Sequence, residues 1–184
     1  MISLRVISGF LKGREIKGYD IEGTRPTMDR VKESVFGSIQ NYIDESVCLD
    51  LFAGSGNLGI ECISNGASIC YFVDNNKIAI NVINDNISKF DIKDKSVVIK
   101  DDYNNALNLF KEKGIKFDLI FLDPPYRFDY INNIVKYISK NGLLNDNGLI
   151  ICEFENDIDK EVIGLRLLKE KKYGYKKVII FKKD

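Results

Sequence analysis

The chain has 184 residues, 45% of them hydrophobic and 29% charged, which predicts one globular domain spanning residues 1–184. Equal numbers of basic and acidic residues give a net charge of 0, so overall charge does not mark a nucleic-acid binder. Histidine is absent, which excludes Ser-His-Asp and Cys-His catalysis and zinc sites that use imidazole. No apolar run approaches the roughly 18 residues of a membrane span, and the start lacks a signal-peptide layout, so we expect a cytoplasmic protein.

The chain begins with a predicted small extension at residues 1–23. Residues 2–8 and 14–17 predict two short strands that form a hairpin and turn through Gly9 and Gly13. Thr27 can then act as the N-cap of a helix over residues 28–42, which has one apolar face. We expect residues 24–184 to form the catalytic core.

Strands and helices alternate through the rest of the chain. This alternation predicts a parallel sheet covered on both faces, with the strand C-termini at one edge where ligands bind. Residues 165–168 and 178–181 predict an antiparallel closing hairpin that turns at Gly174. The other predicted strands are residues 47–52, 69–73, 97–99, 117–122 and 149–154, and the helices are residues 58–64, 77–90, 104–113 and 130–140.

A glycine-rich segment follows the first strand of this alternation. Gly54 and Gly56 let the backbone turn sharply and approach a ligand, and Gly59 permits close packing of the next helix. The N-terminus of that helix favours a negative group. The spacing also fits GxGxxG, so a dinucleotide-binding fold remains an alternative on the glycines alone.

Acidic residues follow the next two strands. Asp74 can accept both ribose hydroxyls of a nucleoside, and an ordinary turn aspartate is the alternative. Either Asp101 or Asp102 can accept from an adenine amino group, although a helix cap explains Asp102 almost as well. Tyr103 can stack on adenine or belong to the core.

The segment Asp-Pro-Pro-Tyr at residues 123–126 ends the strand at 117–122. Pro124 and Pro125 remove two backbone donors and hold their carbonyl groups in a stiff frame. With the Asp123 carboxylate and the Tyr126 ring, this frame can hold the amino edge of a planar base. The alternative is a strand stop with a core tyrosine.

The glycine loop, the acidic strand ends and Asp-Pro-Pro-Tyr together resemble the S-adenosylmethionine-dependent methyltransferases. Within these, the chain resembles the RsmD family of 16S rRNA guanine-N2 methyltransferases over nearly its whole length. The segment RPTMDRVKE at residues 25–33 is the specific part, because Asp-Pro-Pro-Tyr also occurs in adenine-N6 methyltransferases. Met28, Lys32 and the absence of tryptophan from the hairpin depart from the family pattern. The other matching segments are residues 5–9, 13–14, Phe36, residues 50–61 and residues 123–126.

The resemblance implies a Rossmann-like class I S-adenosylmethionine-dependent methyltransferase fold. Its seven-stranded, mostly parallel sheet has the last strand antiparallel, and a small N-terminal β-hairpin is added. Catalytic roles are implied for Asp123, Pro124, Pro125 and Tyr126. Binding of the cofactor S-adenosyl-L-methionine is implied for Arg25, Pro26, Thr27, Asp50, Phe52, Ala53, Gly54, Ser55, Gly56, Asp74, Asn75, Asp102, Tyr103 and Asp123. We expect RNA contacts from Arg5, Lys12, Arg14, Arg30 and Arg127, and no metal.

The expected reaction is methyl transfer to guanine N2 of 16S rRNA within the small ribosomal subunit. Hydrogen bonds to Asp123 and to the Pro124 carbonyl would orient the amine, and Tyr126 would stack on the base. Asp123 is the expected proton acceptor because few other groups are available. The alternatives are an adenine-N6 methyltransferase acting on DNA or RNA, an NAD-dependent oxidoreductase, and a non-catalytic RNA-binding factor.

Basic residues are concentrated near the two ends of the sequence, and the four cysteines lie between them. Residues 1–18 and 166–184 are basic, which suits a phosphate-bearing partner, although a solvated lysine-rich tail is an equal explanation for the second segment. We expect a monomer without a membrane partner. Four cysteines in apolar segments without a CxxC pair predict reduced core residues, namely Cys48, Cys62, Cys70 and Cys152.

Overall fold

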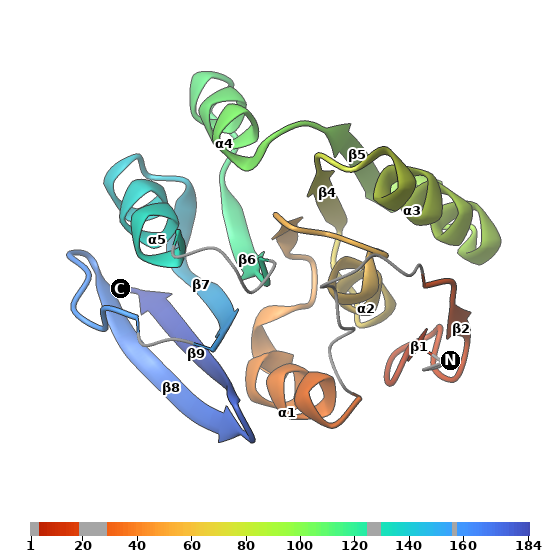
Figure 1. Cartoon of the computed structure of the whole chain (residues 1–184), viewed down its shortest axis with the longest axis horizontal. Helices are drawn as coiled ribbons and strands as arrows, with labels where there is room; N and C mark the ends of the chain where they lie inside the picture. Colours follow the sequence, from red (N-terminus) through yellow and green to blue (C-terminus); the bar gives the residue numbers. More distant parts are fainter. Residues whose placement is uncertain (1–3, 19–28, 125–129, 156–157) are drawn as a thin grey trace.

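A seven-stranded sheet with the order β5-β4-β3-β6-β7-β9-β8 organises the molecule (Figure 1). The computed structural model describes residues 4–18, 29–124, 130–155 and 158–184. The predicted strands are all present, and their boundaries differ most in the last three. The strands of the sheet are β3 (Val47–Asp50), β4 (Ile69–Asp74), β5 (Ser96–Lys100), β6 (Phe117–Leu122), β7 (Leu144–Phe154), β8 (Leu165–Tyr173) and β9 (Lys176–Lys183).

Only β9 runs against the other strands. The pairs β3–β4, β4–β5, β3–β6 and β6–β7 are parallel, whereas β9 is antiparallel to both β7 and β8. Strand β8 therefore points in the same direction as β7, although the two do not touch along the sheet. This confirms the predicted mostly parallel sheet with its last strand antiparallel.

Helices cover both faces of the sheet, as the alternation predicted (Figure 1). Helices α1, α2 and α3 pack on one face, and α4 and α5 pack on the other. The first helix is shorter than predicted because its last turn tightens into a 3₁₀ turn, Gln40–Tyr42. The helices are α1 (Asp29–Ile39), α2 (Asn57–Ser64), α3 (Lys77–Phe90), α4 (Tyr103–Glu112) and α5 (Ile131–Lys140).

The closing hairpin is much longer than predicted. Residues 169–173 were expected in the turn but continue β8, and residues 176–177 begin β9. Strand β8 lies at the edge of the sheet, where lysines are favoured and apolar alternation is weak, so the apolar pattern underestimated its length. The turn itself includes Gly174 as predicted, with φ +63°.

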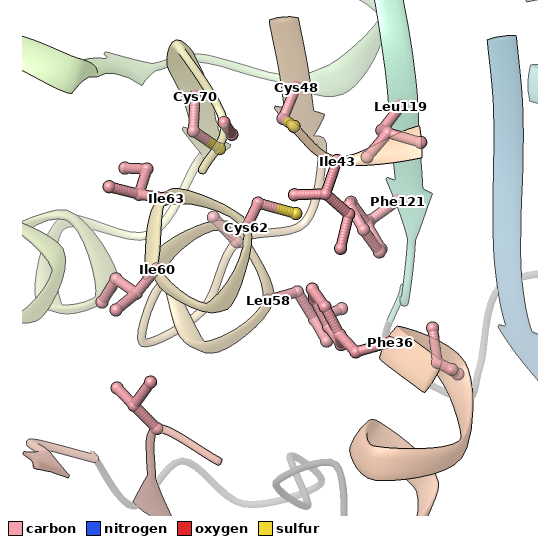
Figure 2. Close-up of a cluster of buried hydrophobic side chains, with 14 of the residues drawn as sticks. Phe36, Ile43, Cys48, Leu58, Ile60, Cys62, Ile63, Cys70, Leu119 and Phe121 are labelled. Atoms are coloured by element: carbon pink, nitrogen blue, oxygen red, sulfur yellow. The ribbon is translucent and has the colours of Figure 1, made fainter. Parts of the chain in front are cut away.

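The first hydrophobic cluster lies between the sheet and α1, α2 and α3. Figure 2 shows Phe36 of α1 and Leu58 of α2 directed toward Phe121 of β6. The rings of Phe36 and Phe121 stack with their centroids 5.8 Å apart. A second cluster fills the space between the sheet and α4 and α5. The four cysteines are buried and reduced, as predicted, and burial raises the pKa of the thiols of Cys62, Cys70 and Cys152.

The N-terminal hairpin is an integral part of the first cluster. Strands β1 (Leu4–Arg5) and β2 (Glu15–Ile16) pair antiparallel, and Leu4 and Ile16 are buried. The segment between them packs on the C-terminal end of α2. A Cβ atom at Gly9 would lie 1.8 Å from the carbonyl oxygen of Ser64, so only glycine allows this approach. The predicted hairpin is therefore confirmed, with shorter strands.

Candidate active site

Acidic residues stand at the ends of adjacent parallel strands. Asp50 ends β3 and lies opposite Phe72 of β4 and Phe121 of β6 in the register of the sheet. Asp74 and Asp123 each come two residues after those partners, on either side of Asp50. The structure therefore brings the three predicted aspartates to one edge of the sheet, where open α/β sheets bind ligands.

Backbone hydrogen bonds hold the glycine loop against this edge. The N–H of Leu51 donates to the carbonyl oxygen of Phe121, at 3.2 Å, and the N–H of Ala53 donates to the carbonyl oxygen of Val73, at 3.0 Å. Gly54 and Gly56 have φ angles of +58° and +81°, as the predicted sharp turn requires. These hydrogen bonds hold the loop backbone against the sheet, and α2 starts directly after the loop.

Asp74 connects the second strand to the glycine loop. One carboxylate oxygen accepts from the N–H of Gly54 and the other from the N–H of Asn76, both at 2.9 Å. Burial raises the pKa of Asp74, and these backbone donors, together with Asn75, oppose the shift. Each carboxylate oxygen has a second lone pair, so the side chain can still accept from ligand hydroxyls. Asn75 next to it is exposed.

Asp50 lies beneath the glycine loop. Its carboxylate accepts from the N–H of Gly59 at 3.0 Å and is 2% exposed. The pKa of Asp50 is raised to about 7, mainly by burial and to a smaller extent by the charge of Asp74, whereas the Gly59 hydrogen bond opposes the shift. Asp50 therefore changes protonation near neutral pH and holds the start of α2 in place.

Aromatic rings gather beside the ends of β3 and β5. The ring of Tyr103 lies 5.5 Å from that of Phe52 and 5.9 Å from that of Tyr130. Asp102 caps α4 by accepting from the N–H of Asn104 at 2.9 Å, as one of its two predicted roles requires. Tyr103 is half-buried and Tyr130 is 40% exposed, so flat surface remains available for an adenine ring. The sequence prediction placed Tyr130 in a loop for RNA recognition, not beside the adenine.

The Asp-Pro-Pro-Tyr segment, which is predicted to be catalytic, is described only at its start. Asp123 is half-buried and Pro124 is buried, directly after β6. The predictions for Pro125, Tyr126 and Arg127 lie outside the described residues, and so do those for Arg25, Pro26 and Thr27. The structure places Asp123 and Pro124 at the C-terminal edge of the parallel strands, and their chemical roles remain predictions.

A buried ion pair connects the N-terminal hairpin to the helix after the glycine loop. The Lys32 ammonium lies 2.9 Å from the Glu61 carboxylate, and both side chains are 0% exposed. It also donates to the Arg5 carbonyl at 2.6 Å and to the Asn57 side chain at 2.7 Å. Burial lowers the pKa of Lys32, and the Glu61 carboxylate opposes this.

Sequence reasoning noted Lys32 only as a departure from the family pattern. The position of Lys32 nevertheless indicated a buried cation, because Lys32 lies on the apolar face of the helix, four residues before Phe36. A cation on such a face requires a buried partner. The sequence alone did not indicate that the partner would be Glu61, which comes from another helix.

A second connection runs from the hairpin through α3 to the glycine loop. The buried Asn86 side chain accepts from the N–H of Lys17 at 2.8 Å and donates to the carbonyl oxygens of Lys17 and Ser55, at 2.9 and 3.0 Å. Lys17 follows β2, and Ser55 lies in the glycine loop. The hairpin therefore supports the predicted cofactor site in addition to presenting charge.

The predicted RNA-binding residues within the described chain are all exposed. Arg5 pairs with Asp29 at 2.9 Å, and Arg14 lies over the ring of Phe90, 4.8 Å from its centroid. These contacts attach the hairpin to α1 and α3 and leave part of each cation available for phosphate. Lys12 and Arg30 are also exposed.

Within the described residues, no helix is long and apolar enough to cross a membrane. The same part of the chain contains no group of three or more cysteine, aspartate or glutamate side chains placed to hold a metal ion.

Comparison with known proteins places these features in a family. A family model described as "Conserved hypothetical protein 95" matches residues 4–182. "Ribosomal RNA small subunit methyltransferase D" of Haemophilus influenzae is 35% identical over 176 residues, which cover 93% of this chain and 89% of that protein. The protein of the same name from Escherichia coli K12 is 32% identical and covers 83% of this chain and 75% of its own length. The chain belongs to the RsmD family.

Solved structures agree with the RsmD assignment. The structure of yhhF from Escherichia coli matches with a TM-score of 0.87 at 27% identity and covers 99% of this chain and 98% of that one. HI0767 from Haemophilus influenzae matches with a TM-score of 0.80 at 31% identity, covering 98% of each chain. The first is named provisionally as a methyltransferase and the second as a methylase. The RsmD chain thus has the predicted Rossmann-like methyltransferase fold.

Proposed function

We propose that this protein transfers the methyl group of S-adenosyl-L-methionine to the exocyclic N2 of a guanine in 16S rRNA of the small ribosomal subunit. The observation that carries the proposal is the convergence of Asp50, Asp74 and Asp123 around the glycine loop. The relatives named small subunit methyltransferases support rRNA as the substrate.

The residues at the glycine loop fit the cofactor. Asp74 keeps lone pairs for two ribose hydroxyls after accepting from Gly54 and Asn76. The φ angles of Gly54 and Gly56 expose loop backbone to the methionine end of the ligand. Arg25, Pro26 and Thr27 are proposed partners at that end, by resemblance to the family.

The adenine end fits the aromatic surface beside the ends of β3 and β5. Phe52 and Tyr103 provide apolar faces, and the second carboxylate oxygen of Asp102 can accept from the adenine amino group while the first caps α4. The cap and the ligand contact are therefore compatible roles for Asp102.

When bound, S-adenosyl-L-methionine supplies an electrophilic methyl group on sulfur. The protein must present guanine N2, whose lone pair is delocalised into the ring and is a weak nucleophile. Hydrogen bonds from this amine to the Asp123 carboxylate and the Pro124 carbonyl favour a tetrahedral nitrogen and aim its lone pair at the methyl carbon. Tyr126 stacks on the base after it has left its RNA stack.

One proton must leave the amine as the new nitrogen–carbon bond forms. Asp123 accepts it, directly or through one water molecule. Asp50 is less suited to this role because it lies beneath the loop, bonded to Gly59 and 2% exposed. The electron pair of the broken carbon–sulfur bond stays on sulfur, so no metal or redox partner is needed.

The choice of guanine N2 over adenine N6 rests on the segment RPTMDRVKE at residues 25–33. Asp-Pro-Pro-Tyr serves both kinds of amine by the same hydrogen bonds and does not discriminate between them. The relatives' names support rRNA methylation without naming the methylated atom.

The test uses small ribosomal subunits from a strain that lacks this protein, with methyl-tritiated S-adenosyl-L-methionine. Nucleoside analysis should yield labelled N2-methylguanosine. Asp123→Ala should fold, bind S-adenosylhomocysteine and lose methyl transfer by at least about a hundredfold, the scale of a proton acceptor. Asp94→Ala removes an exposed carboxylate and serves as the matched control. Labelled N6-methyladenosine, or wild-type transfer by Asp123→Ala, would contradict the proposal.

The form of the substrate can be tested in the same assay. The described chain has no separate RNA-binding domain, so its basic surface is small and should depend on a structured target. We expect higher rates on assembled small subunits than on naked 16S rRNA. Comparable rates on the two substrates would count against this expectation.

A further inference from the structure

A row of cations lies along the seam between α1 and the closing hairpin. We name it the lysine track and define it as Arg30, Lys171, Lys169 and Lys182. Figure 1 shows α1 beside the end of β8 and the start of β9, which lie far from it in the sequence. The sequence predicted residues 166–184 only as a basic segment that suits a phosphate-bearing partner, with a solvated tail as an equal explanation, and it singled out no residue of β8 or β9 as an RNA contact.

Side-chain contacts fix the track on one face of α1. The Lys171 ammonium donates to the Ser34 hydroxyl at 3.2 Å, and the Lys169 ammonium donates to the Ser38 hydroxyl at 2.6 Å. Arg30 lies four residues before Ser34, so all these positions share one ridge of the helix. Successive positions on this ridge rise by about 6 Å, four residues at 1.5 Å each.

Two tyrosine rings contact lysines of the track and restrict the conformations of these lysine side chains. Lys182 lies over the ring of Tyr42, 5.3 Å from its centroid, just after the end of α1. Lys171 lies over the ring of Tyr173, at 5.2 Å. A lysine held over an aromatic face has fewer conformations to lose on binding a ligand than a freely solvated one.

The four cations of the track form no ion pairs with carboxylates among the described residues. Within the described chain, no ion pair involves Arg30, Lys169, Lys171 or Lys182. Other cations of the same hairpin are neutralised, since Arg166 pairs with Asp184, at 2.6 Å, and Lys183 pairs with Asp146, at 2.8 Å. Among the described residues, the three lysines of the track therefore have no carboxylate partner on the face of β8 and β9 that meets α1.

The nearest acids on the same elements do not cancel this charge. The Glu170 carboxylate of β8 forms an ion pair with the Lys160 ammonium, at 2.7 Å. Glu33 of α1 directly precedes Ser34, so it is turned by about 100° around the helix axis from the ridge. The track thus presents positive charge and the Ser34 hydroxyl, a combination that suits phosphate oxygens, whereas the Ser38 hydroxyl donates to the Ser34 carbonyl oxygen at 2.7 Å.

The track leads to the proposed catalytic edge. Strand β8 points in the same direction as β7, so its end at Tyr173 lies at the same edge of the sheet as Asp123. Helix α1 begins at Asp29, directly after the segment 25–28. Lys171 and Arg30 therefore mark the end of the track near the site, and Lys182 marks the far end.

We propose that the lysine track binds the phosphate backbone of the RNA strand next to the target nucleotide. The inference rests on the proposed function, because it takes rRNA as the substrate of the same site. It adds a second contact surface that is separate from the N-terminal hairpin. Lysine supplies point charges for phosphates without reading base identity, so the track positions the RNA and leaves base selection to the catalytic edge.

The experiment compares two triple variants with the same change in charge. The test variant is Lys169→Gln/Lys171→Gln/Lys182→Gln. The control is Lys111→Gln/Lys113→Gln/Lys116→Gln, at exposed positions at the end of α4 and beyond, away from α1. Affinity for a 16S rRNA transcript is measured over a range of salt, together with affinity for S-adenosylhomocysteine.

We expect the test variant to lose RNA affinity while its affinity for S-adenosylhomocysteine is unchanged. Its plot of log affinity against log salt should become less steep by about 2, since each contact to a single strand contributes about 0.7. The control should keep the wild-type slope. If both variants lose equal slope, or neither does, the track has no specific role and the inference is overturned.

Other outcomes are also decisive. Loss of binding to phosphatidylserine vesicles without loss of RNA affinity would assign the track to a lipid surface and overturn the inference. If the test variant aggregates, Arg30→Gln/Lys171→Gln takes its place and should reduce the slope by more than 1. Track-dependent RNA binding without any methyl transfer by the wild type would refute the proposed function and leave this inference standing. Methyl transfer by the wild type, together with RNA binding that the track variants leave unchanged, would support the proposed function and overturn this inference.

Discussion

Replacing Lys32 with methionine should destabilise the protein more than any surface substitution. The lost ammonium donates to three oxygen atoms, those of the Arg5 carbonyl, the Asn57 side chain and the Glu61 carboxylate, at 2.6–2.9 Å. Methionine has a similar volume and fills the same space, so packing changes little. The measured effect therefore reports the loss of charge and hydrogen bonds.

The size of the effect follows from what remains around Glu61. After Lys32→Met, its carboxylate is still buried and accepts from neutral groups of the described chain: the N–H of Ile7 at 3.0 Å, the N–H and hydroxyl of Ser8 at 2.8 and 2.9 Å, and the Asn65 side-chain amide at 3.4 Å. Removing one partner of a buried ion pair costs about 3–5 kcal/mol. For a domain of this size the melting temperature should fall by roughly 6–20 °C.

The assay is denaturant unfolding of Lys32→Met, of the double variant Lys32→Met/Glu61→Gln, and of the control Lys77→Met, which changes an exposed lysine of α3. The double variant should be more stable than Lys32→Met alone, because a buried neutral amide costs less than an unpaired carboxylate and still accepts a hydrogen bond. The control should stay within about 0.5 kcal/mol of the wild type. A loss below about 1 kcal/mol for Lys32→Met, or a double variant no more stable than the single one, would refute the reasoning.

Three further predictions concern the glycine loop. Asp74→Asn keeps an acceptor for the loop but loses a charged partner for ribose, so calorimetry should show S-adenosylhomocysteine affinity reduced roughly ten- to a hundredfold; an unchanged affinity would exclude the ribose role. Because the pKa of Asp50 is raised to about 7, this side chain keeps a proton in the folded state between roughly pH 4 and 7, where the unfolded state has released it. The free energy of unfolding should therefore fall by about 1.4 kcal/mol for each unit of rising pH in this range. Asp50→Asn should remove this slope, and a pH profile identical to the wild type would contradict the assignment. Gly59→Ala places a Cβ 2.3 Å from the Phe72 ring and 2.7 Å from the Cys70 sulfur, and should cost about 1–3 kcal/mol by denaturant unfolding; unchanged stability would show that the packing can relax.

The central sheet could be predicted because its strands are buried on both faces. Continuous apolar runs such as residues 119–122 of β6 are typical of buried strands, and the helices between the strands have a clear 3.6-residue period. The glycine loop was also predictable, since glycines directly after a strand and before a helix have few other uses. The acidic strand ends followed from the parallel direction, which places strand C-termini at one edge.

The contacts that join distant segments could not be predicted from the sequence. Glu61 is one of several acids that could have paired with Lys32, and only the docking of α1 against α2 selects it. The full length of strand β8 escaped prediction, although its start at Leu165 was predicted, because an edge strand needs an apolar face on one side only and is favoured by charge on the other. The lysine track depends on the same hairpin, so its position relative to Ser34 and Ser38 emerged only with the structure.

The position of β9 between β7 and β8 constrains the order in which the sheet can form. During synthesis β8 leaves the ribosome before β9, yet it has no direct pairing with β7 and must wait for β9. Until then, the edge of β7 presents unpaired backbone groups along Leu149–Phe154, a buried and strongly apolar stretch in the finished sheet. An exposed apolar edge of this kind invites pairing with other chains. A nascent chain that stalls before β9 is therefore expected to be prone to aggregation, even though its glycine loop and the aspartates around it are already complete.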